Sequence, residues 1–198
     1  MKSNICKIDH GIKDLEVILQ ESEKIAVYNG LNQNQTLQLR LLCEEVDGML
    51  PKIIDDFEGD FWIEYDNGVC KLNISIELAD FSVQKKKELI EISSDKKNAS
   101  VKGIIGKIRS TIEDYFLNEG NYEPYDMPIS YNIPTENYYG ADYFYLWGLE
   151  QYKKTINQTE NKAAWDELEK SIIASIADDV VVGVKGKKAN IIITKKFV

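Results

Sequence analysis

Two glycines and two lysines lie together where an anion could be held. Gly103 and Gly106 open a segment with helical spacing, and Lys102 and Lys107 flank them. A glycine turn at a helix start presents backbone N–H groups and the positive end of the helix dipole to a phosphate. These four residues are therefore candidate phosphate-binding residues. An ordinary helix start with two permissive positions is the competing interpretation, and the sparse glycines favour it.

Several other chemistries are excluded by the residues present. The chain has one histidine, His10, and three cysteines with no CxxC spacing, which are Cys6, Cys43 and Cys70. A structural zinc site needs four ligands, and a Ser-His-Asp or Cys-His arrangement needs a suitably placed histidine. The pair Glu44–Glu45 is adjacent in sequence, and adjacent residues of a helix do not face each other. Metal and triad chemistry are therefore not expected.

Composition and charge narrow the class of protein. The chain has 198 residues, 43% of them hydrophobic, and a formal net charge of -9. This length and composition predict a globular chain with a substantial core. The negative charge disfavours nucleic acid as a partner because phosphate backbones would be repelled. No segment reads as a signal peptide or a membrane span, and the scattered cysteines fit a reducing compartment, so we expect a cytoplasmic protein with no membrane partner.

Apolar periodicity predicts helices over 12–28, 34–57, 101–117 and 160–178, with a shorter one over 83–92. Asn34 or Thr36 is the expected cap of the second helix. Pro51 lies inside that helix and should kink or end it.

Strands are predicted over 60–66, 69–78, 179–184 and 189–196, and the stretch 118–147 is predicted to be irregular. Asn67–Gly68 between two alternating runs predicts a hairpin. In its second strand, Leu72, Ile74 and Ile76 share one face, while polar residues alternate with them on a face expected to be wet. These elements predict an α+β fold with a mixed, mostly antiparallel sheet covered on one face by helices.

Four segments, taken in order, resemble the histidine-kinase-like ATPase (GHKL) superfamily. Residues 39–49 (LRLLCEEVDGM) resemble its N-box helix, and the 60–78 hairpin resembles the strands that lead into its first glycine box. Residues 102–108 (KGIIGKI) resemble the second glycine box, and 178–197 resemble the final strand pair. The anti-sigma-factor kinases are the most similar members in size. The resemblance implies one domain over 1–198 with the histidine-kinase-like ATPase fold and an aromatic-rich insertion at about 118–150.

The resemblance also implies a nucleotide site for ATP or ADP. Glu45 matches the glutamate that activates a water or a substrate hydroxyl, and Asp80 stands where the adenine amino group is read. Gly103 and its neighbours would hold the phosphates. Met49 stands where the family has an asparagine that binds Mg²⁺, and a thioether is a poor ligand for that ion. Two structural interpretations compete: Glu45 as a solvated edge or ion-pair partner, and Asp80 as a strand end or helix cap.

The expected function is therefore regulatory binding, with residual adenine-nucleotide affinity and without efficient catalysis. A protein partner, such as a transcription or signalling regulator, is implied, and a homodimer is compatible with it. Two alternatives stay open: an ATP-dependent serine kinase of the anti-sigma-factor type with Glu45 as base, and a purely structural dimerisation module. The aromatic stretch 118–150 could be a partner surface, a lid over the site, or a self-packed loop.

Overall fold

The computed structural model describes residues 1–9, 15–54, 57–77, 103–117, 144–159, 162–185 and 187–197. Residues 78–100 lie outside this part of the chain, and with them the helix predicted at 83–92. The described elements run in the order β1 (Cys6–Asp9), α1 (Leu15–Tyr28), α2 (Gln33–Ile53), β2 (Glu58–Asp66), β3 (Val69–Glu77), α4 (Gly103–Leu117), β4 (Phe144–Gly148), α5 (Leu149–Thr159), α6 (Lys162–Glu169), α7 (Ile172–Ile176), β5 (Asp179–Lys185) and β6 (Lys188–Lys196).

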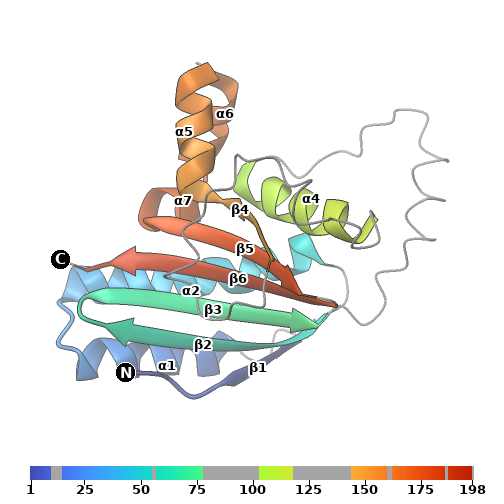
Figure 1. The fold of residues 1–198 in the computed structure, drawn as a ribbon. Helices are drawn as coiled ribbons and strands as arrows, with labels where there is room; N and C mark the ends of the chain where they lie inside the picture. The colour runs from blue at the N-terminus through green and yellow to red at the C-terminus, as the bar shows by residue number, and fades with distance from the viewer. Residues whose placement is uncertain are drawn as a thin grey trace.

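The strands form one six-stranded sheet in the order β1-β2-β3-β6-β5-β4 (Figure 1). Every pairing among these strands is antiparallel. The predicted α+β class is confirmed, and the predicted sheet, expected to be mixed, contains only antiparallel pairs in the described part of the chain. The two hairpins, β2–β3 and β5–β6, meet in the middle of the sheet through the β3–β6 pair.

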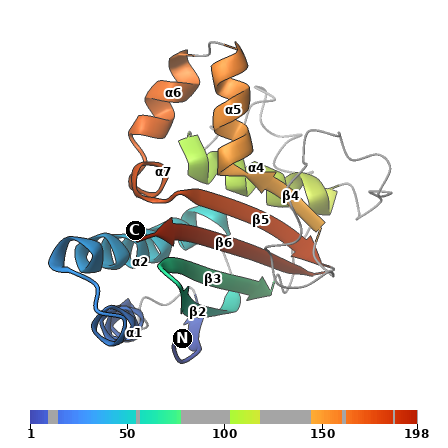
Figure 2. The same cartoon turned by 60° about the vertical axis from the view of Figure 1, so that its left-hand side comes forward.

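The hydrophobic core lies between the sheet and its helices. Ile74 of β3 pairs with Phe61 of β2 and with Ile191 of β6, and all three side chains are buried in the core. Side chains from all six described helices join the same core, so these helices cover one face of the sheet, as the sequence predicts. Figure 2 shows α5 and α6 side by side, rising from the end of the sheet that β4 and β5 form.

On the face of the sheet away from the described helices, side chains are less exposed than the alternation of apolar and polar residues in β3 predicts. Asn73, expected to be wet, is buried, because it lies between Trp62 of β2 and Ile192 of β6 in the same row of the sheet. Its Nδ2 donates to the backbone oxygen of Lys71 at 3.2 Å, which satisfies one amide hydrogen. Neighbouring large side chains therefore remove a polar residue from water even on the face without described helices.

Local signals explain where several elements begin and end. Asn67 and Gly68 both have positive φ, as a two-residue hairpin turn of the predicted kind requires. The cap of α2 is Asn32 instead of the predicted Asn34 or Thr36. The Asn32 side chain accepts a hydrogen bond from the Gln35 backbone N–H, and the Gln35 side chain accepts one from the Asn32 backbone N–H. Together these two bonds make a full capping box. Pro51 lies in the last turn, and α2 ends two residues later.

The C-terminal half differs most from the sequence prediction. The single helix expected over 160–178 is two helices, α6 and α7, because Ser171 caps a new helix by accepting from the Ala174 N–H. Helix α5 was not predicted. The irregular stretch expected over 118–147 includes part of a strand, since Phe144–Gly148 forms β4.

Strand β1, which was not predicted either, continues a segment that runs along β2 from the first residue. Lys2 pairs with Glu64, and Cys6 pairs with Phe61. Three residues of the N-terminal segment therefore face two residues of β2, which is the arrangement of a β-bulge. The bulge turns the backbone N–H of Asn4 out of the ladder toward α1.

Candidate functional site

Glu45, the predicted base, lies on a flank of α2 and is half-buried. Among the described residues it makes no hydrogen bond and no ion pair. Lys52 lies two turns further along the same stripe of α2, and its backbone oxygen accepts from Arg109 Nη1 of α4 at 3.2 Å. The structure therefore brings α2 and α4, the two helices of the predicted site, against each other.

Met49, one turn after Glu45, has its side chain in the core with only 1% of its surface exposed. It packs among buried apolar residues of α2 and the sheet. A side chain in this position has no access to water, and a cation here would lose its hydration without gaining oxygen ligands. In the described residues, no group of three or more histidine, cysteine or acidic side chains is placed to hold a metal ion.

The N-terminus of α4 begins at Gly103, whose φ of +77° lies in the left-handed region that favours glycine. A Cβ placed there would lie 3.5 Å from the backbone oxygen of Glu167 and 4.0 Å from its Oε2. Helix α6 therefore brings a carboxylate next to the proposed phosphate turn. This carboxylate also pairs with Lys170 at 3.5 Å. An incoming phosphate would be repelled by Glu167 unless that side chain moved.

Lys107, the second lysine of the candidate phosphate site, is turned toward α5. Its Nζ lies 5.4 Å from the centre of the Tyr152 ring, within the range of a cation–π interaction. Tyr152 in turn contacts Trp147, with ring centres 5.8 Å apart. Trp147, from the stretch considered as a partner surface, is buried in the core. Gly106 lies between Gly103 and Lys107 in the first turns of α4.

Asp80 and Lys102, the remaining predicted site residues, lie outside the described residues, as do most aromatic residues of 118–150. The structure thus places Glu45 on α2 and Gly103, Gly106 and Lys107 on α4, two helices that contact each other through Lys52 and Arg109. It adds Glu167 and Tyr152, which the sequence did not predict because α6 resembles part of a longer helix and α5 has no clear signal of its own. Neither residue carries a local sequence signal for a role at this site.

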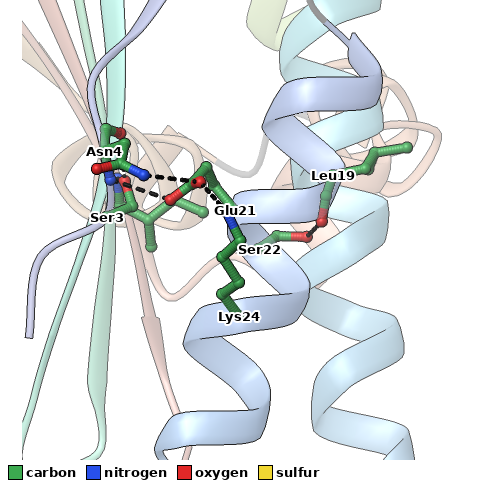
Figure 3. Close-up of polar contacts among 7 residues, drawn as sticks. Ser3, Asn4, Leu19, Glu21, Ser22 and Lys24 are labelled. Carbon is green, nitrogen blue, oxygen red and sulfur yellow. Dashed lines mark hydrogen bonds and ion pairs between the residues drawn. The ribbon is translucent and has the colours of Figure 1, made fainter.

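A second polar cluster joins the N-terminal segment to α1 (Figure 3). The Glu21 carboxylate accepts from the Asn4 backbone N–H at 3.0 Å, from Asn4 Nδ2 at 3.1 Å and from Lys24 Nζ at 2.6 Å. Glu21 is only 5% exposed. Burial by itself would raise the pKa of Glu21, but the hydrogen bonds from Lys24 and Asn4 outweigh it and hold the pKa below its ordinary value.

The three cysteines are free thiols buried in the core. Burial raises the pKa of Cys43 well above its ordinary range and raises the pKa of Cys70 to about 12. A thiol must ionise to act as a nucleophile, so these two cysteines are core residues, as the sequence predicts.

Comparison of the chain with protein-family models, with curated proteins and with solved structures gave no match. Across the described residues, none of the helices combines the length and the apolar character needed to cross a membrane.

Proposed function

We propose that this chain is a regulatory binding protein built on the histidine-kinase-like ATPase fold, with a nucleotide site that no longer uses Mg²⁺. The support for the fold is the order of four segments: the 39–49 motif on α2, the β2–β3 hairpin, the glycine-opened α4 and the final β5–β6 hairpin. In the resembled family, the N-box helix and the second glycine box flank one phosphate site. The contact of Arg109 with the end of α2 supports that arrangement here.

The burial of Met49 is the observation that supports a site without Mg²⁺-dependent chemistry. One turn after Glu45, the resembled family offers an oxygen ligand to the metal. Here the position is filled by a thioether that packs into the core. Without the cation, the charge that develops on a transferring phosphoryl group has no counterpart at this position. Adenine-nucleotide binding without turnover is then what remains for the site.

A measurement of phosphoryl transfer tests this proposal. The purified chain is incubated with ATP and Mg²⁺, and released phosphate and labelled protein are followed. We expect the wild-type chain and the Glu45→Ala variant to give the same background rate. A Mg²⁺-dependent rate that disappears in Glu45→Ala would instead establish the serine-kinase alternative with Glu45 as base.

A purely structural interaction module is a second candidate, and one observation favours it. The Glu167 carboxylate lies beside the N-terminus of α4, where the phosphates would have to be. Saturable ATP binding by the wild-type chain would remove this candidate. Absence of binding in the wild type and its appearance in Glu167→Gln would favour it.

A protein partner, in the manner of a transcription or signalling regulator, and a cytoplasmic location belong to the same proposal. The location rests on the scattered cysteines, all of which are free thiols in the described structure.

A further inference from the structure

We propose that the ligand of the nucleotide site is an adenine nucleoside without a phosphate chain, because Glu167 already supplies the negative charge at the start of α4. This inference rests on the proposed function, since it accepts the nucleotide site on α2 and α4 and names the class of its ligand. The positions of one carboxylate and one ammonium group near the start of α4 support it.

The start of α4 is the place where the proposed site would hold a phosphate. The first N–H groups of a helix have no partner within the helix, and the helix dipole adds partial positive charge there. Helix α4 begins at Gly103, and a Cβ at this residue would lie 3.5 Å from the backbone oxygen of Glu167 and 4.0 Å from its Oε2. The end of α6 therefore brings a carboxylate of the same chain beside the start of α4 (Figure 2).

This approach belongs to α6 as a whole and not only to one flexible side chain. The backbone oxygen of Glu167 is itself close to Gly103, and the next residue, Leu168, is buried in the core at 3% exposure. The Glu167 side chain is 34% exposed, so it is partly shielded from water. A change of rotamer moves the carboxylate, but the anchored helix keeps the charge near the start of α4.

The charges of α6 explain why a carboxylate is stable at this position. The last turn of α6 holds Asp166, Glu167 and Glu169 and has no basic residue. Carboxylates are unfavourable at the C-terminal end of a helix, because the helix dipole is negative there. The positive end of the α4 dipole offsets this cost for Glu167. Glu167 is therefore the internal anion of the α4 start.

Two described lysines near this carboxylate leave much of its charge uncompensated. Lys107 lies one turn after Gly103, but its Nζ is turned toward α5 and lies 5.4 Å from the centre of the Tyr152 ring. Lys170 Nζ pairs with Glu167 Oε1 at 3.5 Å, but the Lys170 side chain is 70% exposed, so water screens this pair. A negatively charged ligand would thus meet a like charge at the start of α4.

The class of ligand follows from this charge. The terminal phosphates of ATP would be repelled by Glu167, and a partly buried pair of charges is screened less than an exposed one. The buried thioether of Met49 adds to the effect, because it does not bind the Mg²⁺ that would neutralise part of the phosphate charge. A nucleoside ends in hydroxyl groups, which can donate a hydrogen bond to a carboxylate.

Isothermal titration calorimetry of the full chain with adenosine and with ATP, in a buffer without Mg²⁺, tests the inference. We expect adenosine to bind at least about tenfold more tightly than ATP, because only ATP is repelled by Glu167. Glu167→Gln should strengthen ATP binding at least about tenfold by removing the like charge. It should change adenosine binding less than about threefold, since the amide oxygen still accepts from a hydroxyl, and this binding shows that the variant is folded.

The matched control is Asp166→Asn, which removes the same charge from the neighbouring position of α6. Asp166 is exposed, so this change should alter the binding of either ligand by less than about twofold. Equal gains in ATP affinity in Glu167→Gln and Asp166→Asn would overturn the role of Glu167, because net charge alone would then explain them.

The other outcomes separate this inference from the proposed function. Tighter binding of ATP than of adenosine by the wild-type chain would overturn the inference and leave the proposed site intact. ATP binding that appears only in Glu167→Gln, with no adenosine binding by the wild type, would also overturn it and favour the structural module. No binding of either ligand by the wild type and by Glu167→Gln would remove the nucleotide site and the inference together.

Discussion

Two glutamates, one on each of the first two helices, show how differently this fold uses a carboxylate. Glu21 on α1 is buried and accepts hydrogen bonds from Asn4 and Lys24. Glu45 on α2 is half-buried and makes no hydrogen bond or ion pair with the described residues. The first holds the N-terminal segment to the helix layer. The second leaves its carboxylate oxygens open to water.

The difference separates a structural group from a candidate binding group. A buried carboxylate is tolerated only when its lone pairs are satisfied, and satisfaction leaves nothing for a ligand. A half-buried, unsatisfied carboxylate costs little because water can reach it. The α2–α4 side of the molecule therefore carries the candidate site, and the seam between the N-terminal segment and α1 carries stability.

The largest effect on stability is expected at Met49, which lies one turn after Glu45 on α2. Met49→Asn would introduce the residue type that the resembled family has at this position, but it would bury an amide without a partner in the core. We expect a loss of about 3–5 kcal/mol in the free energy of unfolding, measured by urea denaturation.

Met49→Leu is the control for this substitution, because it conserves volume and should cost less than about 1.5 kcal/mol. A stable Met49→Asn variant that gains Mg²⁺-dependent ATP binding would show that this position faces a ligand site instead of the core.

Glu21→Gln should cost about 1–3 kcal/mol, because the amide cannot accept from Lys24 and Asn4 as the carboxylate does. Since folding lowers the pKa of Glu21, its carboxylate stabilises the fold above the unfolded pKa of about 4.3 and loses that effect as pH falls through the folded pKa. The difference between wild type and Glu21→Gln in thermal unfolding should therefore shrink on acidification below about pH 4.

The matched control is Glu23→Gln on the same helix. Glu23 is exposed and pairs with Arg40 at the surface, so the change should cost less than about 1 kcal/mol. Equal effects of the two substitutions would mean that the Glu21 cluster is no more than a surface contact.

The glycines of α4 should respond in opposite directions. Gly103→Ala forces a side chain into the left-handed region and should cost about 1–2 kcal/mol. Gly106→Ala lies within the helix and should stabilise the chain by about 0.5–1 kcal/mol. Thermal unfolding of both variants separates a required turn from a permissive position. A destabilising Gly106→Ala would indicate that the helix needs close approach at that residue.

The smallest effect on stability is expected at Glu45. Glu45→Gln should change the free energy of unfolding by less than about 0.5 kcal/mol, since no described partner is lost. Chemical denaturation of Glu45→Gln and Glu21→Gln under the same conditions compares the contributions of the two carboxylates to the free energy of unfolding. A loss of about 2 kcal/mol or more would show that Glu45 is a structural carboxylate like Glu21 and not a binding group.

Local signals predicted the fold well where they were strong. The alternation around Asn67–Gly68 and the periodicity of α2 and α4 predicted the correct elements within a few residues. Strand β1 is four residues long and is stabilised by its pairing with β2. No local sequence pattern predicts that pairing. The break between α6 and α7 rests on one side-chain hydrogen bond from the Ala174 N–H to Ser171.

The site was harder to predict than the fold. The adjacency of α2 and α4 agrees with the resemblance. The approach of Glu167 and Tyr152 depends on how α5 and α6 pack after β4, and the sequence near those residues carries no sign of it. Glu21 and Asn4, separated by 17 residues, are joined by a bulge that exists only once β1 has paired.

The most direct test is a thermal-shift titration of the wild-type chain with ATP and ADP, each with and without Mg²⁺. Ligand at about 100 times its Kd stabilises a protein by about 2.7 kcal/mol, which is a shift of several degrees. We predict that any shift caused by either nucleotide is the same with and without Mg²⁺. A shift that requires Mg²⁺ and is lost in Glu45→Gln would contradict the account and point to an active kinase.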